Sequence, residues 1–155
     1  MPLRLLFAMA LASVLWGCAD SKTCTVMGCV DSVQVSFEPA LSAAGTYELV
    51  MEWEGEILAC HATLPLEPGS ERCESAGGDS TPHLGGLQID RENGGPITGM
   101  WAAKAPASLS VTIRQDDQVI ASRQLEPAYE RFQPNGAECD GDYFCQSAHT
   151  TLELD

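Results

Sequence analysis

Seven cysteines are the residues of this sequence best suited by type and number to do chemistry: Cys18, Cys24, Cys29, Cys60, Cys73, Cys139 and Cys145. An odd number of cysteines cannot pair completely, so one of them needs a role other than a disulfide. Cys18 ends an apolar run and differs in this from the rest. The other six are an even set, typical of a disulfide framework built in an oxidising compartment. We therefore separate Cys18 from six disulfide candidates.

Two pairing schemes for the six candidates are physically sensible. The local scheme has three bonds: Cys24–Cys29, Cys60–Cys73 and Cys139–Cys145. The crossed scheme keeps Cys60–Cys73 and joins the two cysteines before the first expected strand to the two before the last. If those strands run parallel, as in immunoglobulin domains, Cys29 and Cys145 enter from the same end of the fold. The crossed bonds also close longer loops and constrain the unfolded chain more, which favours them slightly, but the sequence leaves both schemes open.

The first residues explain the odd cysteine. Arg4 precedes an apolar run from Leu5 to Trp16, the pattern of a secretory signal. About a dozen apolar residues are too few for a membrane-spanning helix, which needs about 20. Leu15-Trp16-Gly17-Cys18 resembles the lipobox of bacterial lipoproteins, with Trp16 in place of the usual small or aliphatic residue. The resemblance implies a signal peptide at 1–17, cleavage before Cys18, and a mature protein held to the membrane by acyl chains such as palmitate on Cys18.

The residues after Cys18 and the net charge indicate the compartment and the partners. In lipoproteins, Asp directly after the cysteine favours the inner membrane, whereas here Ala19 stands between Cys18 and Asp20. The resemblance therefore implies the outer membrane of a Gram-negative bacterium. The net charge of −14 repels nucleic acid and anionic headgroups. We expect a cell-envelope protein that contacts the membrane through its acyl chains and has other envelope proteins, but no nucleic acid, as possible partners.

Apolar and polar residues alternate along several short segments, which predicts half-buried strands. The expected strands are 33–38, 46–54, 57–64, 87–90, 97–103, 109–114, 119–125 and 150–154. Residues 65–86 are rich in Pro, Gly, Ser and Glu and are expected to form a long surface loop. The pattern predicts an all-β fold, a single immunoglobulin-like antiparallel β-sandwich of seven or eight strands at 33–155, preceded by a lipidated tether at 18–32.

Turn residues and cysteines together resemble a known group of proteins. The features that carry the resemblance are the lipobox, the cysteine pair before the first strand, Gly45-Thr46-Tyr47-Glu48-Leu49, Cys60, Pro134-Asn135-Gly136-Ala137-Glu138-Cys139, and Cys145-Gln146-Ser147-Ala148-His149-Thr150-Thr151-Leu152. In these respects the chain is similar to uncharacterised bacterial lipoproteins of a kind abundant in myxobacteria. The resemblance implies a disulfide-stabilised immunoglobulin-like sandwich on a lipid anchor, and it implies no activity.

Metal and cofactor sites have little support in the sequence. The cysteine spacings do not match zinc knuckles, and an oxidising compartment favours disulfides. Glu138, Asp140 and Asp142 form a small acidic loop that is a weak candidate for calcium, because hard cations prefer carboxylate oxygens. A solvated turn explains the same residues. We expect no cofactor.

Candidates for catalysis and binding lie in two places. Ser80 and His83 could form a hydrolytic pair on the 65–86 loop, but no nucleophile-elbow motif surrounds the serine. Trp53 shares an alternating face with other apolar residues and is expected in the core. Trp101 lies in a glycine-flanked segment and is the better candidate for surface binding. The sequence predicts a non-catalytic binding or structural module, with a small envelope hydrolase or an inhibitor module using the 65–86 loop as the alternative.

Overall fold

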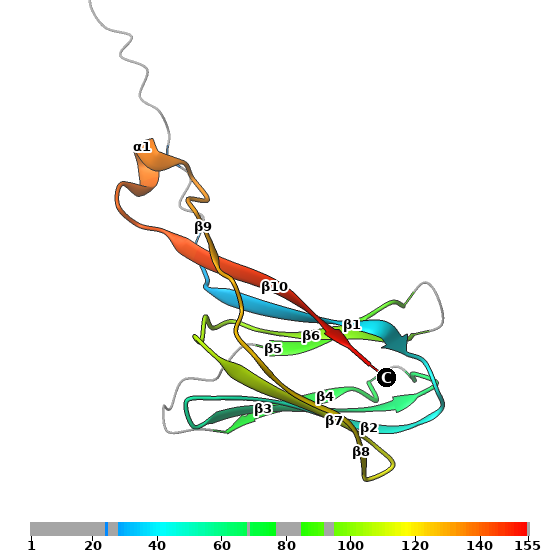
Figure 1. Cartoon of the computed structure of the whole chain (residues 1–155). Coiled ribbons are helices and arrows are strands. Elements are labelled where there is room, and N and C mark those ends of the chain that lie inside the picture. The colour runs from blue at the N-terminus through cyan, green and yellow to red at the C-terminus, as the bar shows by residue number, and fades with distance from the viewer. Residues whose placement is uncertain (1–23, 25–27, 68, 77–84, 92–94, 155) are drawn as a thin grey trace, which may run out of the picture.

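A computed structural model of the chain describes residues 24, 28–67, 69–76, 85–91 and 95–154 (Figure 1). Within these ranges the chain forms two five-stranded β-sheets that pack face to face. The predicted all-β sandwich is therefore confirmed. Cys18, the signal peptide expected at 1–17, and the Ser80 and His83 pair lie outside the described residues.

Each sheet combines strands that lie far apart in the sequence. Sheet A consists, in spatial order, of β5 (Gly85–Ile89), β6 (Ile97–Ala102), β1 (Ser32–Leu41), β10 (Cys145–Glu153) and β9 (Glu130–Phe132). Sheet B consists of β4 (Arg72–Ala76), β3 (Glu56–Leu64), β2 (Gly45–Trp53), β7 (Leu109–Gln115) and β8 (Gln118–Leu125). A short helix, α1 (Ala137–Asp140), precedes β10. The first and last strands, β1 and β10, run parallel side by side, as expected, and the other pairs in the described chain are antiparallel.

The described residues contain ten strands, so the expected count of seven or eight was too low. The expected 65–86 loop holds β4, whose residues are mostly exposed, and β5 begins at its end. The strand β9 has three exposed residues at the edge of sheet A. Edge strands of this kind have no buried face, so they show no apolar alternation. They form because a neighbouring strand offers backbone partners, and for β4 also a cysteine, since Cys73 lies directly opposite Cys60.

The core lies between the sheets and is built from the inward positions of each strand. Tyr47, Leu49, Met51 and Trp53 are all buried along β2, as their alternation predicts. The Trp53 indole Nε1 donates to a carboxylate oxygen of Glu56 at 2.9 Å, so the buried ring keeps a partner for its N–H. Among the described residues no helix has the length and apolarity to cross a membrane.

Candidate functional site

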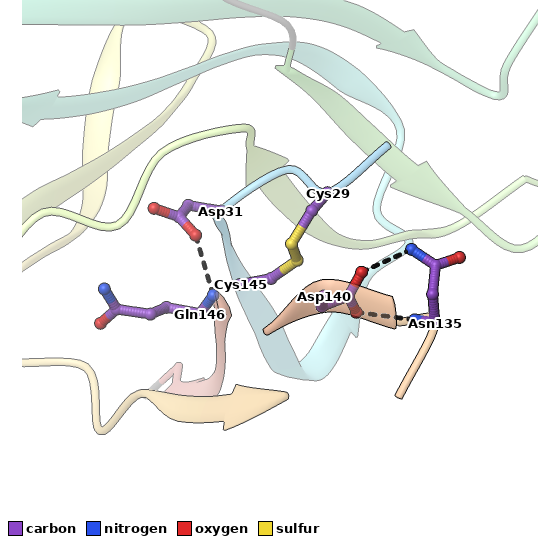
Figure 2. Close-up of a disulfide and its surroundings, with 6 residues drawn as sticks. All are labelled: Cys29, Asp31, Asn135, Asp140, Cys145 and Gln146. Carbon is purple, nitrogen blue, oxygen red and sulfur yellow. Dashed lines mark hydrogen bonds between the residues drawn. A yellow bond between two sulfur atoms is a disulfide. The ribbon is translucent and has the colours of Figure 1, made fainter. Parts of the chain in front are cut away.

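Two long-range disulfides close one end of the sandwich, which we call the bridged end. Cys24 bonds Cys139 and Cys29 bonds Cys145, with Cα atoms 5.6 Å and 5.7 Å apart (Figure 2 shows the second). A third disulfide, Cys60–Cys73, joins β3 to β4. The structure thus has the crossed scheme. Its cause is the parallel pairing of β1 and β10, which brings the residues before both strands to the same end.

Side-chain hydrogen bonds reinforce the bridged end (Figure 2). A carboxylate oxygen of Asp31 accepts from the backbone N–H of Gln146 at 2.8 Å and ties the segment before β1 to β10. The two carboxylate oxygens of Asp140 accept from the backbone N–H and the side-chain amide of Asn135, each at 2.8 Å. Asp140 therefore fixes the turn that leads into α1.

The calcium candidates are explained by this turn. Both oxygens of Asp140 already accept hydrogen bonds from Asn135, while Glu138 and Asp142 are exposed. In the part of the chain that the structure describes, no three His, Cys, Asp or Glu side chains come together as metal ligands. The acidic loop is accounted for without a cation.

Large apolar side chains are exposed around the bridged end, and we call them the apolar patch: Val30, Phe132, Tyr143 and Phe144, with exposed fractions of 56%, 44%, 60% and 46%. Val30 and Phe144 adjoin the bonded cysteines Cys29 and Cys145, and Phe132 lies opposite Cys145 in the β9–β10 pairing. Figure 1 shows α1 and the beginning of β10 beyond the main body of the two sheets.

A different kind of surface covers the outer face of sheet A. Its centre is one row of four residues that are neighbours across β5, β6, β1 and β10: Gly86, Trp101, Gln34 and His149. We call this the tryptophan row. The next row along the same face holds Gln88, Gly99, Ser36 and Thr151. Apart from the indole, the side chains of both rows are short or medium-sized, and none is a Lys, Arg, Asp or Glu.

Local sequence explains why Trp101 points outward. Met100 and Ala102 on either side are buried in the core, so alternation sends Trp101 to the opposite face, where it is 37% exposed. The Nε1 edge of the indole lies over Gly86, where a Cβ would come within 3.3 Å of it. Gly99 in the next row is buried, and the Gln88 side-chain oxygen and the Val35 carbonyl oxygen occupy the space that a Cβ there would need. The indole therefore rests on β5 and keeps part of its surface exposed to solvent.

A shallow hollow of about 280 Å³ opens on the same face, beside the tryptophan row. Its polar side chains include Gln34, Ser147, His149 and Glu130, from β1, β10 and β9. The Ser36 hydroxyl and the Nε2 atom of His149 are hydrogen-bonded at 2.7 Å, which holds the imidazole against β1. The hollow and the indole thus form one continuous surface through Gln34, which belongs to both.

The outer face of sheet B carries charges instead. Glu48 and Arg114 lie opposite each other in β2 and β7 and form an ion pair of 2.8 Å, and a carboxylate oxygen of Asp116 accepts from the backbone N–H of Thr46 at 2.9 Å. These residues line a hollow of about 400 Å³. Because Glu48 pairs with Arg114 and Asp116 of the β7–β8 turn bonds the backbone of β2, the hollow is explained as a solvated, charged surface.

Comparison of the chain with protein-family models, with curated proteins and with solved structures finds no match.

Sequence reasoning found Trp101 but missed the residues that surround it. Gln34 and Ser36 occupy the outward positions of an expected strand, and His149 comes before the expected start of the last strand. Their alternation shows only that they point away from the core. That they lie beside Trp101 depends on the strand order β6–β1–β10, which no local pattern encodes.

Proposed function

We propose that this chain is a non-catalytic binding module of the bacterial cell envelope, anchored in the outer membrane by acyl chains on Cys18. The observation that carries the anchor is the position of the apolar patch, whose residues neighbour Cys29 and Cys145 at the end of the fold to which Cys24 and Cys29 are bonded. The lipobox, the cysteines and the turn residues, which together resemble myxobacterial-type lipoproteins, support this proposal.

Covalent geometry limits how far the anchor stands from the fold. Cys24 follows Cys18 by six residues, which reach at most about 22 Å when fully extended. Cys24 is bonded to Cys139 at the bridged end. An acyl chain on Cys18 therefore keeps this end, with its exposed Phe132, Tyr143 and Phe144, close to the bilayer.

The side chains of the apolar patch suit such a position. Aromatic residues favour the boundary between headgroups and acyl chains, and Tyr143 offers both an apolar ring and a polar hydroxyl. The acidic residues nearby, Glu138 and Asp142, disfavour an anionic surface. The bridged end thus fits a neutral or zwitterionic membrane surface, with the acyl chains providing the attachment.

The binding part of the proposal follows from the outer face of sheet A. An exposed tryptophan beside a polar hollow suits the binding of a ligand. On the outer face of sheet B, by contrast, the charges of Glu48 and Arg114 pair with each other. The net charge of −14 argues against nucleic acid as the ligand.

Metabolic labelling with a palmitate analogue tests the anchor. The full-length chain is expressed in a Gram-negative host beside Cys18→Ser and the control Thr112→Ala, which leaves the lipobox and the three disulfides intact. We expect label and membrane fractionation in the wild type and the control, and loss of both in Cys18→Ser. Label retained in Cys18→Ser, or a wild type without label, would refute the anchor.

A further inference from the structure

We propose that the outer face of sheet A binds an uncharged oligosaccharide, with one pyranose ring stacked on the Trp101 indole and the adjoining unit hydrogen-bonded in the hollow beside Gln34 and His149. The inference deepens the binding part of the proposed function by naming the class of ligand. It does not depend on the lipid anchor.

The indole provides the stacking surface. Trp101 is 37% exposed and lies between Gly86 and Gln34, with the Nε1 edge of its ring over Gly86, so the exposed part of the indole faces solvent. A pyranose ring presents a face of C–H groups, which are apolar and slightly positive, and the face of an indole is apolar and slightly negative. The two surfaces are flat and match in size and polarity.

The groups beside the indole match sugar hydroxyls. A sugar hydroxyl both donates and accepts hydrogen bonds, and so do the amide of Gln34, the imidazole of His149 and the hydroxyl of Ser147. The bond between Ser36 and His149 at 2.7 Å holds the imidazole in place before a ligand arrives. Glu130 adds a carboxylate at the rim of the hollow, which accepts from hydroxyls.

The size of the hollow suits one sugar unit. Its volume of about 280 Å³ lies near the lower end of small-molecule clefts, which begin at about 300 Å³. It shares Gln34 and His149 with the tryptophan row, so a ligand of two or more linked units can reach the ring and the hollow together.

Charge and composition disfavour the other classes of ligand. Sheet A has Arg131 on β9, but the strands β5, β6, β1 and β10 contain no lysine or arginine, and the rims of the face carry Glu38, Glu130 and Glu153. An anionic ligand, whether nucleic acid or acidic polysaccharide, would find no lysine or arginine on these four strands and would meet carboxylates. A protein interface of stable size centres on several large apolar anchors, whereas the two central rows offer Trp101 alone among the described residues.

An array of immobilised neutral and anionic oligosaccharides tests the proposal on the purified full chain. We expect binding to neutral members and not to anionic ones. Titration calorimetry with the best-bound soluble oligosaccharide then compares four variants with the wild type. We expect Trp101→Ala to weaken binding at least tenfold, Trp101→Phe to weaken it less because a ring remains, and Gln34→Ala to weaken it severalfold.

Val119→Ala is the matched control, because it shortens an exposed apolar side chain on β8 of sheet B. It should bind as the wild type does. Circular dichroism and thermal unfolding of Trp101→Ala should match the wild type, since the ring lies outside the core.

Four outcomes would overturn the proposal: binding to no array member, binding to anionic members only, equal affinity in Trp101→Ala, or Trp101-dependent dimerisation in sedimentation, which would make the face an interface between two copies. None of these results affects palmitate labelling of Cys18, and an unlabelled Cys18 does not affect the array. Failure of this inference and failure of the anchor are therefore distinguishable.

Discussion

The two sheets of this sandwich differ in how they are closed and in what they show to solvent. Sheet A contains the first and last strands, and disulfides spanning 115 and 116 residues close its bridged end. Sheet B is built largely from neighbouring hairpins and has a disulfide spanning 13 residues. The central outer rows of sheet A hold no Lys, Arg, Asp or Glu around Trp101, whereas the outer face of sheet B carries the Glu48–Arg114 ion pair.

This difference assigns different roles to the sheets. A face whose charges pair with one another is stable in water and needs no ligand. A face that exposes an indole among neutral polar side chains gains by covering that indole. The long-range disulfides join the segments before β1 and β10, two strands of this face that come from opposite ends of the chain.

The largest effect is expected from removing both long-range disulfides. The variant with Cys24, Cys29, Cys139 and Cys145 all changed to alanine loses loops of over a hundred residues, and its free energy of unfolding should fall by about 4.7 kcal/mol or more. Cys60→Ala/Cys73→Ala opens a much shorter loop and should lose about 3 kcal/mol. Guanidinium unfolding measures both. A smaller loss in the first variant than in the second would contradict the contrast between the sheets.

The two long-range disulfides should also be strongly non-additive. With Cys24–Cys139 in place, Cys29–Cys145 closes only a small additional ring. Removing one of the two bonds should therefore lower the free energy of unfolding less than removing the remaining bond afterwards. Equal and additive losses would show that the two bonds act on different loops.

The next largest effect concerns the close approach of strands under the tryptophan row. Gly99→Ala places a methyl group against the Val35 carbonyl and the Gln88 side chain, so we expect a loss of about 1–3 kcal/mol in unfolding free energy. Thr112→Ala is the control at an outward position of sheet B, where the loss should be below about 1 kcal/mol. Urea unfolding of both variants decides. If Gly99→Ala costs nothing, the strands are not held as closely as described.

A smaller effect is expected where the chain crosses between the sheets. The Tyr129 hydroxyl donates to the Pro106 carbonyl at 2.9 Å and ties the β8–β9 connection to the β6–β7 connection. Burial, with the Asp31 charge adding to it, raises the pKa of Tyr129 from 10.0 to about 12. The folded state therefore binds this proton more tightly than the unfolded state does. The resulting stability is fully present below pH 10 and is lost as the pH rises through 12.

Tyr129→Phe tests this coupling. It should cost about 1 kcal/mol at pH 7 through the lost hydrogen bond. Between pH 10 and pH 12 its unfolding free energy should fall less steeply than that of the wild type. Tyr47, whose pKa is also raised mainly by burial, accounts for part of the remaining slope. Identical slopes would remove Tyr129 as a source of the alkaline loss.

The smallest effect is expected on the charged face. Glu48→Gln breaks the exposed ion pair with Arg114 and should cost about 0.2–1 kcal/mol, less at high ionic strength. Unfolding in low and high salt measures this, and oligosaccharide affinity should stay unchanged. Reduced oligosaccharide affinity in Glu48→Gln would indicate that the ligand binds to sheet B instead of sheet A.

The fold was predictable where a strand has one buried face. Alternation from Tyr47 to Trp53 identified both the strand and its core side, because burial selects every second residue. It failed for β4 and β9, whose exposed residues pair through backbone groups at sheet edges. The candidate site was predictable only in Trp101. Its neighbours Gln34 and His149 come from strands distant in sequence, and their meeting depends on tertiary strand order.

Chemical-shift mapping tests the central claim, that sheet A carries the ligand face. The ¹⁵N-labelled protein is titrated with the best-bound neutral oligosaccharide while backbone amide and indole N–H resonances are followed. We expect the largest shifts at the indole of Trp101 and at Gln34, Ser36 and His149, with β2 and β7 unaffected. Shifts centred on Glu48 and Arg114, or no localised shifts at all, would contradict the account.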